Sequence, residues 1–137
     1  MKWLSLLFLA LPAFAEVTVK DAWVRGTVPT QSVTGAFMTV TSSVDAKLVG
    51  ASTPIASMTE IHESKMKDGV NQMNAVESVA LPAGKAVALK PGSYHMMMMG
   101  LTKPVVAGEK VPIELIVESG GKRSIVKVQA EVRPLGK

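Results

Sequence analysis

The stretch that decides the fold is residues 57–76, SMTEIHESKMKDGVNQMNAV. Asp68-Gly69 at its centre is a strong signal for a two-residue hairpin turn, because such turns need residues that tolerate positive φ. The flanking segments 57–65 and 70–76 are typical of strands. With Asp68 and Gly69 as the loop, the predicted cross-strand pairs are Lys67 with Val70, Met66 with Asn71, Ser64 with Met73 and His62 with Ala75.

Short strand-like segments with Gly and Pro turns between them continue on both sides of this hairpin. No segment of useful length has a convincing apolar period of 3.6 residues. Short strands at regular spacing are typical of an antiparallel sandwich or barrel. The sequence therefore predicts one all-β domain, an antiparallel β-sandwich or Greek-key barrel. Its further expected strands are residues 17–19, 22–24, 36–41, 47–51, 87–89, 94–99, 111–117 and 124–132.

Length and composition agree with a single folded domain. The chain has 137 residues, of which 47% are hydrophobic and 19% charged. That balance is typical of a folding chain, not a disordered one. Because only 4% of the residues are aromatic, the core must be built from aliphatic side chains and methionine.

The first fifteen residues have the pattern of a secretory signal peptide. Lys2 gives a positive start, residues 3–11 are apolar, and Ala13-Phe14-Ala15 is a small-x-small ending. Cleavage is expected after Ala15, which leaves residues 16–137 as the mature domain in the periplasm. The apolar run is too short to span a bilayer comfortably, so no stable membrane insertion is expected. No cysteine follows the cleavage site to carry a lipid.

The charge balance gives little support to a nucleic-acid partner. The chain has 15 basic and 11 acidic residues, a net charge of +4. The basic residues are scattered and have no interleaved aromatic residues, so we expect a solvated surface, or at most steering towards an acidic partner. Their modest concentration near the C-terminus comprises Lys122, Arg123, Lys127, Arg133 and Lys137.

The chemistry that the sequence can perform is concentrated between residues 58 and 99. This segment holds both histidines and seven of the nine methionines, and the chain has no cysteine. Neutral imidazole and thioether ligands suit copper(I), a soft cation, better than zinc, magnesium or calcium. In an oxidising compartment thioethers also survive better than a pair of thiolates. The composition therefore indicates a copper(I) site.

Strand alternation selects ligands within this segment. Side chains on a strand alternate between faces, and in the predicted hairpin Met73 lies diagonal to His62, roughly 7–8 Å away between backbones. On the later strand, His95 and Met97 share one face. We therefore expect four neutral metal ligands, namely His62, Met73, His95 and Met97.

The remaining methionines take other roles in this hypothesis. Met66 and Met99 fall on the ligand faces and are second-rank candidates. Met96 and Met98 point to the opposite face and are expected to be core. Each methionine taken alone has a packing interpretation, and a lone histidine can be a structural, hydrogen-bonded residue. The joint occurrence of two His-plus-Met couples is harder to explain by packing.

The spacing of these residues carries a resemblance. Ten residues separate His62 from Met73, twenty-one separate Met73 from His95, and one separates His95 from Met97. This spacing resembles the signature of the periplasmic copper chaperones of the PCu(A)C family. The resemblance covers nearly the whole mature chain. Its other matching segments are residues 22–25, 35–37, 60–63, 81–85, 89–92 and 99–101.

The resemblance implies a cupredoxin-like β-barrel that holds copper(I) near the surface, with the ligands His62, Met73, His95 and Met97. It also implies delivery of copper for cytochrome c oxidase assembly, to an acceptor such as oxidase subunit II or a thioredoxin-like copper assembly protein. Two departures are visible. Glu63 stands where some members have a methionine, and the chain stops at Lys137 without a His- and Met-rich tail, so no second copper(II) site is expected.

Other classes of function differ from copper delivery in the residues that they need. A blue-copper electron carrier needs a cysteine ligand, which is absent. Two histidines without a nucleophile, base and acid constellation do not predict an enzyme. A periplasmic copper storage or resistance protein is the main alternative, because binding chemistry alone does not separate storage from delivery. A β-domain with methionine-rich packing is the remaining one.

Overall fold

The computed structural model describes residues 16–134, in which ten strands and no helix occur. The all-β prediction is confirmed. The expected signal peptide, residues 1–15, lies outside the described residues. Within the described part, no helix is long and apolar enough to cross a membrane. The strands are β1 Val17–Arg25, β2 Val33–Ser42, β3 Ala46–Ser52, β4 Ala56–Lys67, β5 Val70–Val76, β6 Val79–Leu81, β7 Ala86–Leu89, β8 Tyr94–Leu101, β9 Lys110–Ser119 and β10 Lys122–Arg133.

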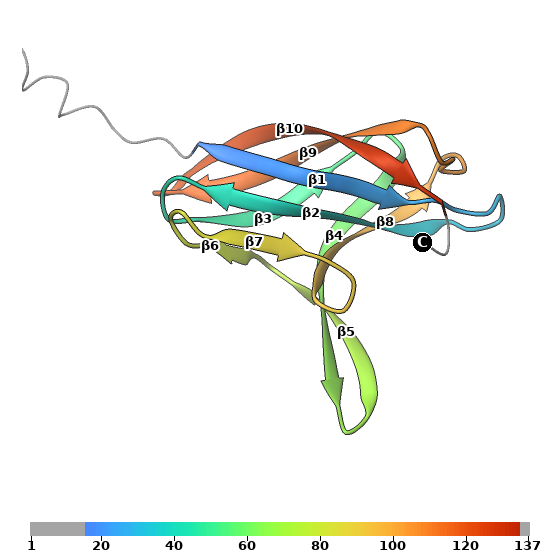
Figure 1. The fold of residues 1–137 in the computed structure, drawn as a ribbon, viewed down its shortest axis with the longest axis horizontal. Helices are drawn as coiled ribbons and strands as arrows, with labels where there is room; N and C mark the ends of the chain where they lie inside the picture. The colour runs from blue at the N-terminus through green and yellow to red at the C-terminus, as the bar shows by residue number, and fades with distance from the viewer. Residues whose placement is uncertain (1–15, 135–137) are drawn as a thin grey trace, which may run out of the picture.

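The strands follow one another in the order β5-β4-β8-β2-β1-β10-β9-β3-β6, and β7 pairs with β2. Figure 1 shows how this sheet curls so that β3 and β9 lie behind β1 and β2. All pairings are antiparallel except that of β1 with β10, which is parallel. A purely antiparallel sheet was expected. Parallel pairing needs a long connection, and here nearly the whole domain separates the two strands.

The core lies between these layers and is aliphatic, with methionine contributing. Along β9 every second residue from Val111 to Val117 is buried, as the period of a strand with one face inward requires. Met96 and Met98 on β8 are 0% and 1% exposed, so their predicted packing role is confirmed. Their alternate neighbours on β8 therefore point away from this core.

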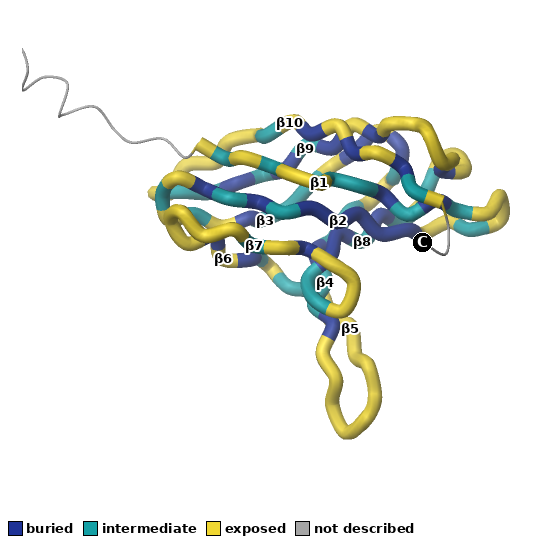
Figure 2. Tube along the Cα trace, viewed as in Figure 1, coloured by how far each residue is buried: buried dark blue, intermediate teal, exposed yellow. Residues whose placement is uncertain are grey.

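The hairpin of β4 and β5 has the predicted register, from Lys67 opposite Val70 to His62 opposite Ala75. Asp68 and Gly69 have φ values of 53° and 79°, as a type I′ turn requires. The outer part of the hairpin projects from the body of the domain (Figure 1), and Figure 2 shows that it is exposed. We call this projecting part, residues 65–75, the arm. β4 pairs with β8 at its inner end and with β5 along the arm, so it links the core to the arm.

Candidate metal centre

β4 and β8 bring the two histidines face to face. In their antiparallel register His62 is directly opposite His95, and Glu60 is directly opposite Met97. Directly opposed residues point to the same face of a sheet. The two imidazole centroids are 5.7 Å apart and their planes are inclined by 54°. The sequence predicted which side chains share a face within each strand, but not that these two strands are neighbours.

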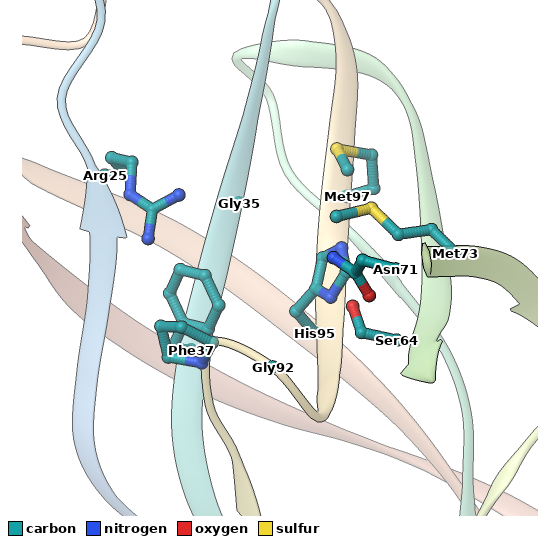
Figure 3. Close-up of a pocket in the computed structure, with 10 residues that line it drawn as sticks. Arg25, Gly35, Phe37, Ser64, Asn71, Met73, Gly92, His95 and Met97 are labelled. Atoms are coloured by element: carbon teal, nitrogen blue, oxygen red, sulfur yellow. The ribbon is translucent and has the colours of Figure 1, made fainter. Parts of the chain in front are cut away.

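The remaining predicted ligand, Met73, comes from the arm. It lies opposite Ser64 on β4 and is therefore the diagonal neighbour of His62. Figure 3 shows its thioether extending towards Met97, above the ring of His95. Met73 is 53% exposed, whereas His95 is only 5% exposed. The four residues thus lie on three adjacent strands, β5, β4 and β8, with Met73 on the solvent side.

A cavity of about 150 Å³ opens beside these side chains and is lined by Met73, His95 and Met97. His62 is not among the lining residues, and its ring lies next to that of His95. Further lining residues that sequence reasoning did not identify include Arg25, Gly35, Phe37 and Asn71.

A signal for one of these missed residues, Asn71, was present in the sequence, whereas the role of Gly35 is visible only in the structure. The predicted hairpin register places Asn71 two residues before Met73, and so on the same face of β5. Gly35 is opposite Met97 in the pairing of β2 with β8. A Cβ atom at Gly35 would lie 3.1 Å from the ring of Phe37, so glycine leaves room for this wall of the cavity. That close approach is visible only in the folded chain.

Aromatic rings continue from the histidines towards β1. The ring of Phe37 is 6.1 Å from that of His95 and 4.6 Å from that of Trp23, centroid to centroid. The guanidinium of Arg25 lies 5.3 Å from the Phe37 centroid, and that of Arg133 lies 4.9 Å from the Trp23 centroid. Both distances are in the range of cation–π contacts. The back of the site is therefore an apolar wall with a positive charge at its edge.

The environment of His95 favours its neutral form. Burial lowers the pKa of His95 from its ordinary value of 6.5, and the nearby His62 and Arg25 lower it further, while a backbone hydrogen bond involving Ser93 opposes the shift. Burial has this effect because a charged imidazolium loses its hydration. A neutral imidazole is the form that binds a metal ion. Burial thus favours the form of His95 that is able to bind a metal ion.

His62 has one satisfied and one unsatisfied ring nitrogen. Its Nε2 lies 2.8 Å from Oε1 of Glu60. Its Nδ1 is buried and has no hydrogen-bond partner among the described residues. Buried polar atoms nearly always have a partner, so an exception calls for an explanation such as an ion.

The candidate donor set is two imidazoles and two thioethers, all of them neutral. Thioethers and imidazoles together suit copper(I), whereas copper(II) prefers nitrogen and oxygen donors in a tetragonal arrangement. No cluster of three or more His, Cys, Asp or Glu residues, the pattern of a harder metal site, occurs within residues 16–134. The residues present therefore fit a soft monovalent ion.

Comparisons with known proteins identify the family and the fold. The sequence profile of the LpqE-like family matches residues 17–132. Lxx21020 of Leifsonia xyli subsp. xyli, which carries a lipoprotein name, is 37% identical over 121 residues that cover 80% of this chain and 72% of that protein.

Two solved structures share the fold. The copper(I) form of DR1885 from Deinococcus radiodurans is 33% identical, with a TM-score of 0.68 over 88% of this chain and 81% of that chain. The copper-bound PCuAC domain from PmoF2 has a TM-score of 0.70 over 90% of this chain and 97% of that chain, at 18% identity. The predicted cupredoxin-like β-sandwich is thereby confirmed.

Proposed function

Since this chain belongs to the LpqE-like family and is a PCu(A)C protein, we propose that it is an exported copper(I) chaperone. It binds one copper(I) ion through His62, Met73, His95 and Met97 and passes that ion to an acceptor protein. The copper is cargo and not a resident cofactor. The protein is a binding protein and not an enzyme.

One observation carries the assignment of the ligands. His62 and His95 face each other on the same side of the sheet as the two thioethers, and Nδ1 of His62 is buried without a partner. A lone pair in that position is costly unless something binds it. The copper-bound relatives supply the identity of that ion, since both are described as holding copper.

In this proposal the residues bind the ion through neutral, soft donor atoms and not through opposite charge. All four ligands are neutral, so the bound ion keeps its positive charge, and protons compete only at the two imidazoles. The buried ring of Phe37, which packs against Trp23, forms one side of the cavity and limits access of water there. Two thioethers favour copper(I) over copper(II), so the oxidation state is selected by the donor atoms.

Release follows from the gradient of exposure across the site. Met73 is 53% exposed on the arm, Met97 is half-buried, and His95 is 5% exposed. An acceptor can approach from the solvent side and displace the weak thioether of Met73 first, while the histidines still hold the ion. Copper is then exchanged ligand by ligand and is never free in solution.

The second candidate function is copper storage or resistance. Further exposed thioethers at Met58 and Met66, which are 53% and 70% exposed, favour it because they could bind additional ions. Met58 is directly opposite Met99 on β8, two residues along the register from Glu60 and Met97. Stoichiometry separates the two functions, because a carrier binds one transferable ion and a store holds several.

The periplasm is the proposed compartment, and cytochrome c oxidase assembly is the proposed destination. The signal-like residues 1–15 and the lipoprotein name of the Leifsonia relative support export. Oxidase subunit II and a thioredoxin-like copper assembly protein are the proposed acceptors. Both acceptors are proposed because the chain resembles the PCu(A)C family.

A copper(I) chelator competition tests the binding site. We expect one copper(I) per wild-type chain, and losses for His62→Ala and Met97→Ala that exceed the roughly 10- to 100-fold cost of removing an outer-shell group. Val70→Ala is the control, because Val70 is 58% exposed near the tip of the arm and its side chain has no donor atom. Equal affinity of wild type, His62→Ala and Met97→Ala would show that the proposed site is wrong.

Transfer is tested by mixing the copper(I)-loaded protein with the metal-free copper domain of oxidase subunit II. Movement of one ion to the acceptor supports delivery. Retention of several ions per chain without transfer supports storage. If a strong copper(I) chelator removes no metal from the native protein, the carrier role is excluded.

A further inference from the structure

We infer that Glu60 is a positioning residue that sets the tautomer of His62, and that His62 therefore binds copper(I) through Nδ1. The inference rests on the proposed copper site and adds which atom is the ligand and what orients it. Its basis is the 2.8 Å contact between Nε2 of His62 and Oε1 of Glu60, together with the buried, unpartnered Nδ1 of the same ring.

The position of Glu60 follows from strand geometry. Glu60 precedes His62 by two residues on β4, so both side chains are on the same face. Across the sheet Glu60 is opposite Met97, and His62 is opposite His95. Glu60 is therefore in register with one proposed ligand and in contact with another. Among the ion pairs of the described residues, Glu60 pairs with His62 alone.

The contact determines where the proton of the neutral imidazole lies. A carboxylate only accepts hydrogen bonds, so Nε2 must carry the hydrogen and donate it to Oε1. Nδ1 is then left with its lone pair, which is the form a metal ion needs. The opposite tautomer would bring a lone pair against the carboxylate and leave a buried N–H without an acceptor. Both effects favour the Nε2–H tautomer.

The carboxylate also acts on the bound ion. A metal-binding histidine usually donates its other ring N–H to an acceptor such as a carboxylate, which fixes the ring orientation and makes the ligand nitrogen more basic. The four proposed ligands carry no charge, so Glu60 supplies the negative charge nearest to His62. It favours a bound cation over an empty site without using up a coordination position.

The same strand supplies a matched control. Glu63 is adjacent to His62 in sequence but points to the other face, where its carboxylate lies 3.7 Å from Nζ of Lys65. Like Glu60→Ala, Glu63→Ala removes one glutamate and its negative charge close to His62 in the sequence. It leaves the contact between Glu60 and His62 intact.

The first experiment uses the metal-free protein. Long-range 1H–15N correlation spectra of ¹⁵N-histidine-labelled protein report which ring nitrogen carries the hydrogen. We expect His62 to be in the Nε2–H form in the wild type and in Glu63→Ala, and to lose that preference in Glu60→Ala. Glu60→Gln retains an acceptor oxygen and should restore most of it. A wild-type His62 protonated on Nδ1 would overturn the inference, whether or not copper binds.

The second experiment adds copper(I) to the same samples. We expect the ¹⁵N resonance of His62 Nδ1 to move on binding, and Glu60→Ala to weaken copper(I) affinity by about 10- to 100-fold, with Glu60→Gln in between and Glu63→Ala unchanged. A metal shift at Nε2, or equal affinity of Glu60→Ala and wild type, would contradict the inference. If no variant and no wild-type protein binds copper(I), the proposed function fails, while the tautomer result still stands on its own.

Discussion

His62 and His95 are directly opposite each other on β4 and β8, with their ring centroids 5.7 Å apart. The two residues differ in their surroundings. His95 is 5% exposed and lies next to Phe37, whereas His62 contacts the carboxylate of Glu60. Burial thus lowers the pKa of one imidazole, that of His95, and a hydrogen bond orients the other.

The stability of the metal-free protein should depend on pH through His95. Its pKa is lowered below 6.5 in the folded state by burial, so between that lowered pKa and 6.5 the unfolded chain binds more protons. Stability therefore rises with pH in this window, is fully present above 6.5, and is lost as the pH falls through the folded pKa. Urea unfolding from pH 5 to pH 8 measures this. His95→Gln should have a flatter profile, and an equally steep profile would exclude His95 as the cause.

Substitutions of methionines on opposite faces of the sheet should have different effects, one on the free energy of unfolding and the other on copper(I) affinity. Met98 is 1% exposed in the core, and Met98→Ala should lower the free energy of unfolding by about 2–5 kcal/mol. Met73 is 53% exposed, and Met73→Ala should leave stability within about 0.5 kcal/mol while weakening copper(I) binding. Urea denaturation and chelator competition on both variants check this. A Met73→Ala protein with wild-type affinity would remove Met73 from the site.

Removal of the positive charge at Arg25 should strengthen copper(I) binding. Arg25 lines the cavity and is one of the causes that lower the pKa of His95, so it also repels a bound cation. Arg25→Gln should raise affinity about two- to fivefold at low salt, as expected for a solvent-screened charge interaction of roughly 0.5–1 kcal/mol. The gain should shrink at high salt. Arg133→Gln is the control, since Arg133 contacts Trp23 and does not line the cavity.

Binding of a soft monovalent ion should stabilise the fold. A ligand present at about 100 times its dissociation constant stabilises the native state by about 2.7 kcal/mol, which raises the melting temperature of a domain of this size by roughly 10 °C. Silver(I) is a suitable air-stable substitute for copper(I), and thermal unfolding followed by circular dichroism measures the shift. The shift should vanish in His62→Ala and persist in Val70→Ala. An equal shift with zinc would contradict the soft-ligand assignment.

Local patterns in the sequence were enough to predict part of the candidate site. Asp68-Gly69 predicted the turn and the register of β4 with β5, because only a few residue types fit that turn. Alternation along β8 separated Met97 from the core residues Met96 and Met98, because side chains on a strand change face at every residue. Both inferences need only contacts between residues close in sequence.

Long-range pairing is what the sequence alone did not reveal. The direct opposition of His62 and His95 depends on β4 and β8 being neighbours, and the wall formed by Arg25 and Phe37 depends on β8 being next to β2 and β2 next to β1. Many strand orders have the same local alternation. The order is selected by how the whole set of apolar faces closes on one core, a property of the folded chain that no single segment contains.

The sequence by itself therefore determined the class of fold, the hairpin register and a set of soft neutral donors without cysteine. Only the tertiary structure decided which of them meet, how far each is exposed, and that Glu60 contacts His62 and leaves Nδ1 buried without a partner. The physical reason is how far apart in the sequence the interacting residues are. Donor chemistry and strand period are properties of residues and their near neighbours, whereas burial and ring orientation arise from contacts between strands that are brought together only by folding.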